Sequence, residues 1–182
     1  YLILVADFKT IKGYLTSKLN THLVHRTKSA KTKSFIQYQD TFGDLYTSKI
    51  KDGFKKNFFK LFEGINVCPY CNRNYINPIY KEKKLGKDNQ NQAPDIEHFF
   101  PKSVYPFLSL SISNLLPSCA FCNKIKSDFD TYDNFKSPYE IEEDDIKFKF
   151  DSVDTLNRTI RIKTDLDNSK VLSLNELYSE VH

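Results

Sequence analysis

Tryptophan and methionine are absent from this chain, and it contains no long run of apolar residues. The longest apolar stretch, residues 1–6, is too short to span a membrane and lacks the basic flank and cleavage site of a signal peptide. These absences argue against a membrane partner, and we expect a soluble, cytoplasmic protein. Because Tyr1 opens a sequence without methionine, we also expect a fragment of a longer chain.

The aromatic residues present are phenylalanine and tyrosine, which occur 15 and 11 times. The apolar fraction of 40% is ordinary, so the core is predicted to be unusually rich in phenylalanine. A length of 182 residues corresponds to one domain, or to a compact core with one appended subdomain.

Charge is distributed unevenly along the chain, although the net charge is only +4. Counting Lys and Arg against Asp and Glu, residues 1–127 carry +11 and residues 128–182 carry −7. A basic surface favours a polyanionic partner, because neutralised phosphates release their counterions. A solvated charged face is the alternative explanation of the same residues.

The first 64 residues have the periodicity of helices. Apolar residues recur every three to four positions between residues 42 and 62, which predicts one long amphipathic helix. Gly64 is a suitable helix stop, and an earlier helix is predicted over residues 2–25, with a polar loop over residues 26–33.

The rest of the chain mixes short strands and helices. Alternation and turn residues predict strands over residues 72–80 and 95–100, a hairpin of residues 146–150 and 159–163, and a polar loop over 81–94. Short helices are predicted over residues 120–128 and 173–181. The predicted class is α+β, with a helical region (1–64), a central core (65–130) and a C-terminal extension with a β-hairpin and a helix (131–182).

All four cysteines belong to C-x-x-C pairs, formed by Cys68 with Cys71 and by Cys119 with Cys122. Two such pairs predict a structural zinc site, because zinc prefers four tetrahedral thiolates. A redox motif is the alternative, since Cys-Pro-Tyr-Cys also occurs in glutaredoxins. That alternative requires a strand before the motif and a helix after it, whereas the sequence predicts a helix before it.

A second group of polar residues lies between and beside the cysteine pairs. Glu97 and His98 are adjacent, and Asn114 and Asn123 follow. Histidine titrates near neutrality and can activate water, while a carboxylate and an amide oxygen suit Mg²⁺. These residues together predict metal-assisted hydrolysis of a phosphodiester.

Residues 68–127 resemble the HNH endonucleases of the ββα-metal type, in particular those braced by two C-x-x-C zinc knuckles. The resemblance lies in three motifs, which are D-x-E-H-x-x-P-K-S, N-L-L-P-S-C and C-x-x-C-N-x-x-K. It implies a ββα core and a DNA endonuclease that uses Mg²⁺ or Mn²⁺ and leaves 5′-phosphate and 3′-hydroxyl ends. It also implies bacterial restriction or anti-phage defence, with an ATPase or sensor subunit as partner.

The resemblance also assigns roles to individual residues. His98 would be the general base, and Glu97 and Asn123 would bind the catalytic cation. Asn114 would hold the loop between the strands and so orient the histidine. This chain has Glu97 where the family more often has Asp, so Asp95, two residues earlier, is a second candidate for that ligand.

Basic residues near these motifs are candidates for contacts with nucleic acid, namely Lys102, Lys124 and Lys126. The leading prediction is therefore a DNA-cleaving HNH nuclease with one structural zinc and one catalytic cation. Two alternatives stay open, a nonenzymatic zinc-stabilised module that binds nucleic acid and an HNH nuclease that acts on RNA.

Overall fold

A computed structural model describes residues 2–27, 29–51, 53–77, 94–133, 135–142, 147–156 and 159–165. The chain forms two compact units, Tyr1–Thr131 and Tyr132–His182. The predicted helix over 173–181 lies outside the described residues, as does the predicted loop over 81–94 apart from Pro94. The predicted helical region (1–64) and central core (65–130) both fall within the first of these units.

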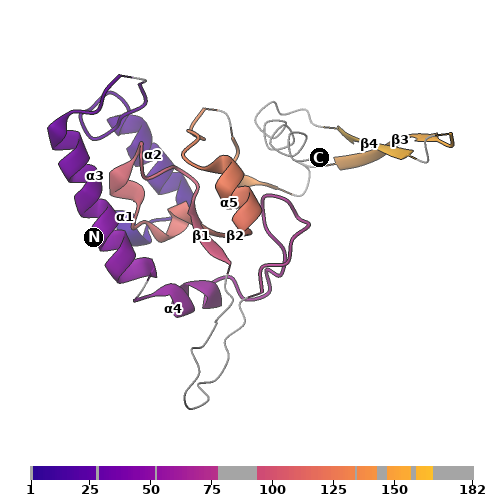
Figure 1. Ribbon diagram of the computed structural model, residues 1–182, viewed down its shortest axis with the longest axis horizontal. Coiled ribbons are helices and arrows are strands. Elements are labelled where there is room, and N and C mark those ends of the chain that lie inside the picture. The colour runs from indigo at the N-terminus through magenta and orange to yellow at the C-terminus, as the bar shows by residue number, and fades with distance from the viewer. Residues whose placement is uncertain are drawn as a thin grey trace, which may run out of the picture. The chain divides into compact units, whose positions relative to one another are not determined.

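Helices dominate the start of the first unit (Figure 1). They are α1 (Leu2–Val5), α2 (Phe8–Lys18), α3 (Lys33–Leu45), the π-helix η1 (Tyr46–Lys51) and α4 (Lys55–Lys60). The helix predicted over 2–25 is wrong in extent, because Asp7 interrupts it and α2 ends at Lys18. The Asp7 carboxylate accepts a 2.7 Å hydrogen bond from the backbone N–H of Thr10 and caps α2.

The single helix predicted over 42–62 is divided between α3, η1 and α4. Its apolar stripe is nevertheless used, because Tyr46, Ile50 and Phe58 are all buried in one cluster with Leu115. Gly64 has a φ of 95°, a conformation that favours glycine, and lies in the turn that follows α4.

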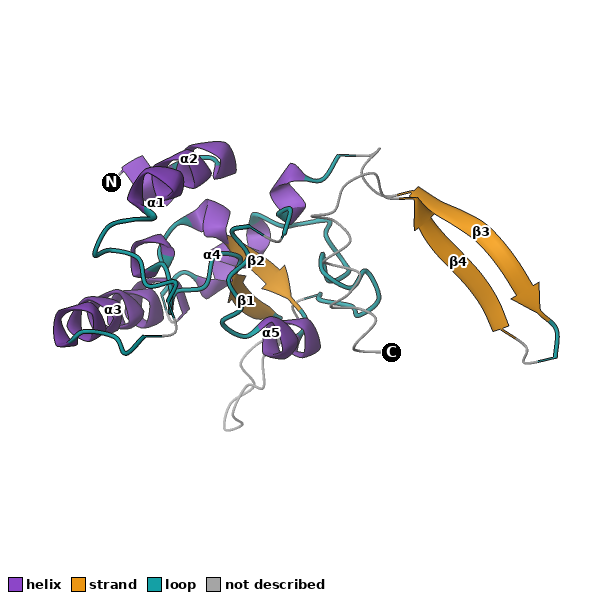
Figure 2. Ribbon diagram, turned by 90° about the horizontal axis from the view of Figure 1, so that it is seen from above, coloured by secondary structure: helices purple, strands orange, loops and turns teal. Residues whose placement is uncertain are grey.

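Two short antiparallel strands follow, β1 (Asp95–His98) and β2 (Leu115–Ser118), and then helix α5 (Ala120–Lys126) (Figure 2). Single-turn helices η2 (Pro106–Leu108) and η3 (Ile112–Asn114) lie between the strands. The predicted strand after residue 94 and the predicted helix after residue 119 are confirmed. No strand occupies the described part of residues 72–80, where one isolated bridge joins Val67 to Tyr75.

Side chains of β1 alternate between two layers, as they must in an extended strand. Ile96 packs against the cluster formed by η1 and α4, whereas Glu97 pairs with a lysine of α5. The small sheet is thus covered by the helical region on one face and by α5 on the other. This places the strand that carries the predicted site residues between two helical layers.

Phenylalanine rings fill the interior of the first unit, as the composition predicts. Phe8 stacks on Phe100 with ring centroids 5.4 Å apart, and Phe99 meets Phe100 edge-on at 5.0 Å. Tyr105 extends this group, with its ring 5.9 Å from Phe100. The Phe99–Phe100 pair directly follows β1, so core packing fixes the end of the strand at His98.

The second unit contains the single-turn helix η4 (Pro138–Glu140) and the strands β3 (Lys147–Asp154) and β4 (Thr159–Asp165). The two strands pair antiparallel, with a register shift between Phe150 and Ser152. The hairpin predicted from the alternating pattern is confirmed.

Candidate functional site

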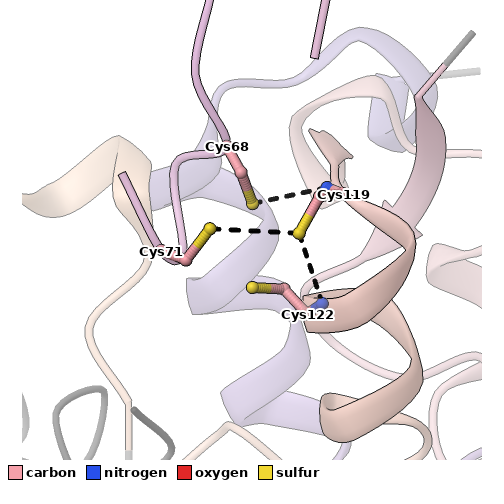
Figure 3. Close-up of side chains that lie close together, drawn as sticks. All are labelled: Cys68, Cys71, Cys119 and Cys122. Carbon is pink, nitrogen blue, oxygen red and sulfur yellow. Dashed lines mark hydrogen bonds between the residues drawn. The ribbon is translucent and has the colours of Figure 1, made fainter. Parts of the chain in front are cut away.

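The four cysteines lie close together although the pairs are far apart in sequence (Figure 3). Their sulfur atoms are all within 4.8 Å of one another, and those of Cys71 and Cys119 are 3.9 Å apart. Four cysteine sulfurs at this spacing can hold a metal ion, and a zinc ion fits such a set. The sequence-based prediction that both pairs form one cluster is confirmed.

Backbone turns at each pair aim the sulfurs inward. Asn72, with a φ of 45°, reverses the chain after the first pair and donates its N–H to the carbonyl of Cys68 at 2.7 Å. In the second pair, Cys119 caps α5, and its sulfur accepts from the N–H of Cys122 at 3.4 Å. The backbone N–H groups of Asn74, Cys119 and Cys122 donate to cysteine sulfurs and stabilise negative charge on them.

The thiols polarise one another. A hydrogen bond from the Cys122 thiol lowers the pKa of Cys68 to about 5, and backbone N–H groups, including that of Cys119, act in the same direction. The pKa of Cys122 is raised because it keeps the shared proton. Cys68 is therefore poised to form the thiolate that a metal requires.

The local structure does not match a glutaredoxin-type redox motif. Helix α4 and a single bridge at Val67 precede the first pair, and a turn through Asn72 follows it. A low-pKa redox cysteine of that type begins a helix. Cys68 and Cys71 instead face the second pair of cysteines.

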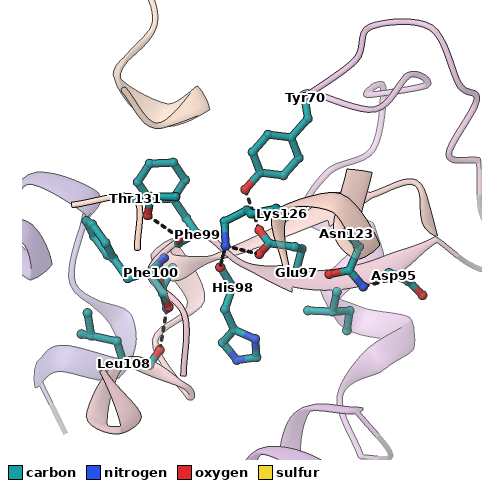
Figure 4. A network of polar contacts seen from close by, with 12 residues as sticks. Tyr70, Asp95, Glu97, His98, Phe99, Phe100, Leu108, Asn123, Lys126 and Thr131 are labelled. Atoms are coloured by element: carbon teal, nitrogen blue, oxygen red, sulfur yellow. Dashed lines mark hydrogen bonds and ion pairs between the residues drawn. The ribbon is translucent and has the colours of Figure 1, made fainter. Parts of the chain in front are cut away.

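A buried ion pair lies between β1 and α5 (Figure 4). The Lys126 ammonium is 2.6 Å from one oxygen of Glu97, and these side chains are only 3% and 2% exposed. The other Glu97 oxygen accepts a hydrogen bond from Tyr70, which lies between Cys68 and Cys71. Lys126 also donates to the backbone carbonyl of His98 at 2.8 Å. This network ties the cysteine cluster to β1, and a buried Lys126 does not fit the predicted contact with substrate phosphate.

Asp95 and Asn123 form a separate, half-buried pair. The Asn123 amide donates to the Asp95 carboxylate at 2.9 Å, with one residue on β1 and the other on α5. Figure 4 places this pair beside Glu97 along the same strand face. Of the two carboxylates considered for the cation, Asp95 is the one in contact with Asn123.

His98 points away from the buried ion pair, toward the helical region (Figure 4). Its Nε2 lies 3.0 Å from the carbonyl oxygen of Ser109, and its ring meets that of Tyr46 edge-on at 4.5 Å. Because a carbonyl only accepts, Nε2 carries the hydrogen and Nδ1 keeps its lone pair. Burial lowers the pKa of His98 to about 3, with smaller contributions from Lys102 and Lys126 against the opposing Ser109 bond. The imidazole is therefore a neutral acceptor at neutral pH.

Asn114 holds the loop that connects the two strands. Its side chain is fully buried and accepts from the N–H of Phe100 at 2.8 Å. The same amide donates to the carbonyl groups of Phe100 and Leu108 at 3.0 and 3.1 Å. The loop leaving His98 is thereby fixed by one side chain.

Asp95, Glu97, His98 and Asn123 line a single cleft of about 460 Å³. Lys102 lines it too, whereas Lys124 is exposed on α5 and does not. Sequence reasoning missed three further lining residues from the helical region, which are Tyr46, Lys51 and Lys55. In the sequence, Tyr46 belongs to the apolar stripe of residues 42–62, and Lys51 and Lys55 are two of the lysines that lie between its apolar positions.

The fold and site define a small α+β unit in which a four-cysteine cluster braces a polar cleft. Over 73 residues, or 40% of this chain, the sequence is 38% identical to Septu protein PtuB from Bacillus thuringiensis. The match spans 23% of the length of that relative. No protein-family model matches the chain, and no solved structure matches it. Among the described residues, every helix is too short or too polar to cross a membrane.

Proposed function

We propose that this chain is an HNH endonuclease that hydrolyses phosphodiester bonds of DNA with the help of a divalent cation. The observation that carries the proposal is the shared cleft of Asp95, His98 and Asn123. It joins a candidate base to two oxygen-bearing side chains. The resemblance of residues 68–127 to zinc-braced HNH nucleases supports the same assignment.

His98 would act as the general base at Nδ1. Its Nε2–H is engaged by the Ser109 carbonyl, so the ring is held with the lone pair of Nδ1 available for the proton of a water molecule. Lys102 contributes to the low pKa of His98. A phosphate near Lys102 would offset that charge and so raise the pKa of His98.

The donors present fit a hard cation. Asp95 and Asn123 are half-buried, and the Asn123 amide nitrogen lies 2.9 Å from a carboxylate oxygen of Asp95. Each side chain also has an oxygen of the kind that Mg²⁺ prefers. Mg²⁺ or Mn²⁺ bound there would neutralise charge on the phosphate and the leaving oxygen. Glu97 is the ligand that the resemblance implies, but both of its oxygens are already engaged by Lys126 and Tyr70.

Plasmid cleavage tests the proposal. We expect the zinc-loaded protein to nick supercoiled DNA in Mg²⁺ or Mn²⁺ and to leave 5′-phosphate ends, and His98→Ala to lose at least about 100-fold of that rate. His25→Ala is the matched control, because His25 also bonds a backbone carbonyl and contacts an aromatic ring, yet does not line the cleft.

The controls separate the remaining alternatives. No cleavage in any metal would leave a nonenzymatic nucleic-acid-binding module, and full activity of His98→Ala would remove the assigned base. Parallel digestion of duplex DNA and single-stranded RNA at the same salt concentration decides between the two substrates.

The partial similarity to Septu protein PtuB supports a role in bacterial defence against phage. In that setting an ATPase or sensor subunit would switch cleavage on. Phage plating on cells that carry the intact locus, with wild-type protein or His98→Ala, tests this role. Equal plating on both would contradict it.

A further inference from the structure

We propose that three lysines, Lys51, Lys55 and Lys102, form a wall of the cleft that binds the phosphates of a nucleic-acid strand beside His98. This lysine wall rests on the proposed function and names how its substrate is held. Residues 51 and 55 lie outside the part of the chain that resembles HNH nucleases.

The π-helix η1 brings the helical lysines to the cleft. In an α-helix, a side chain five positions along lies about 140° beyond a full turn. In η1 the hydrogen bonds run from residue i to i+5, so the wider turn returns Lys51 toward the face of Tyr46. Both residues line the cleft, and Lys55 follows one turn later in α4.

Tyr46 connects the wall to the base. Its ring lies edge-on to His98 at 4.5 Å, and the Lys102 ammonium sits 5.0 Å from the centroid of the same ring. Lys102 comes from the loop after β1, whereas Lys51 and Lys55 come from the helical region. The three lysines thus line one cleft from two separate segments.

The charge of the wall is not neutralised within the described residues. None of the three lysines has an ion pair there, in contrast to Lys126, which is paired with Glu97. Burial, followed by the charge of Lys51, lowers the pKa of Lys102, so these like charges act on each other. Lysines without an ion pair in a cleft favour an anionic ligand.

The ligand that fits is a phosphodiester backbone. The cleft is also lined by Asp95 and Asp128, neither of which is paired with a lysine among the described residues, while Glu97 is neutralised by Lys126. The three lysines of the wall therefore outnumber the two remaining carboxylates of the cleft. A strand places successive phosphates along such a row, whereas a free nucleotide occupies one position. The +11 charge of residues 1–127 favours the extended polyanion.

Salt-dependent binding tests the wall without relying on cleavage. The zinc-loaded His98→Ala protein is titrated with labelled duplex at several salt concentrations in buffer free of divalent cations. Lys51→Gln with Lys55→Gln is expected to reduce the slope of log K against log salt by about 1.8, and Lys102→Gln by about a further 0.9. Lys49→Gln with Lys60→Gln is the matched control, with the same charge change on the same helices outside the cleft.

Each outcome decides the proposal. A smaller slope for the wall variants with an unchanged control slope supports the proposal. If a mononucleotide competes with the labelled duplex as strongly as an oligonucleotide does, the proposal is overturned. Equal loss for both pairs, no loss for the wall variants, or no binding at low salt overturns it as well. Should the wall variants behave as expected while wild type cleaves nothing, the nuclease proposal fails and the binding site stands. If His98→Ala is unfolded by circular dichroism, wild type in the same buffer replaces it.

Discussion

Two carboxylates two residues apart on β1 have different surroundings, and these surroundings separate their roles. Glu97 is 2% exposed and bound to the buried Lys126 and to Tyr70. Both residues line the cleft, but Asp95 is half-buried and contacts Asn123. A buried charge is tolerated only with its partner, so Glu97 is committed to Lys126, while Asp95 can accept a cation at little cost.

Substitution of each carboxylate by its amide separates the two roles. We expect Asp95→Asn to fold normally and to lose Mn²⁺ affinity and cleavage by at least about 10-fold. Glu97→Gln is expected to destabilise the fold by about 3 kcal/mol, because Lys126 keeps a buried charge without its counter-ion. Urea unfolding and Mn²⁺ titration measure the two effects.

The double variant Glu97→Gln with Lys126→Met is the control for that prediction. Removing both charges should recover much of the stability lost by Glu97→Gln alone, since no unpaired charge stays buried. If Asp95→Asn cleaves normally while Glu97→Gln folds and loses metal, Glu97 is the ligand and the assignment made here is reversed.

At the scale of elements, sequence patterns predicted the hairpin of β3 and β4, strand β1 and helix α5. They did not predict strand β2 or the breaks within the helical region. They could not predict the π-helix, because the buried residues Tyr46 and Ile50 keep a four-residue spacing that an α-helix shares. The strand predicted after Cys71 failed because Asn72 takes a positive φ to close the cysteine turn.

Gly53 follows the π-helix, and a side chain there would be tightly packed against the backbone. A Cβ there would lie 3.0 Å from the carbonyl oxygen of Lys49 and 3.1 Å from that of Ser48. We expect Gly53→Ala to lower stability by about 1 kcal/mol, and to weaken nucleic-acid binding as η1 shifts Lys51. Thermal unfolding and the duplex titration described above measure both.

Gly43 provides the matched comparison for Gly53. It lies inside α3, and a Cβ there would meet nothing within 4 Å. Gly43→Ala should therefore stabilise the protein by up to about 1 kcal/mol, through the better helix propensity of alanine. The same sign of change at both positions would contradict the close backbone contact at Gly53.

At the scale of the whole molecule, the site is assembled from segments that no local pattern connects. The residues of the three motifs in residues 68–127 could be recognised in the sequence by their order and spacing. The ion pair of Glu97 with Lys126, and the contribution of Tyr46 and Lys51 to the cleft, depend on how α5 and the helical region pack on β1. Such tertiary contacts leave no periodic trace, which is why Lys126 was predicted from the sequence to contact nucleic acid.

The cysteine cluster is the main link between those segments. It joins the chain at Cys68 to the start of α5 at Cys119, and Tyr70 extends the link to Glu97 on β1. The helices pack on the same strands through Ile96 and Leu115. Loss of the cluster should therefore unfold the helices together with the strands.

Cys68→Ser tests this dependence directly. Structural zinc sites contribute on the order of 10 kcal/mol to folding, more than the whole stability of many small domains. We expect Cys68→Ser to lose bound zinc, helical circular dichroism and its cooperative thermal transition, whereas His98→Ala keeps all three and loses cleavage. A Cys68→Ser protein that retains one zinc per chain and the wild-type transition would show that packing alone holds the cleft together, and equal unfolding of both variants would show that His98 is a structural residue.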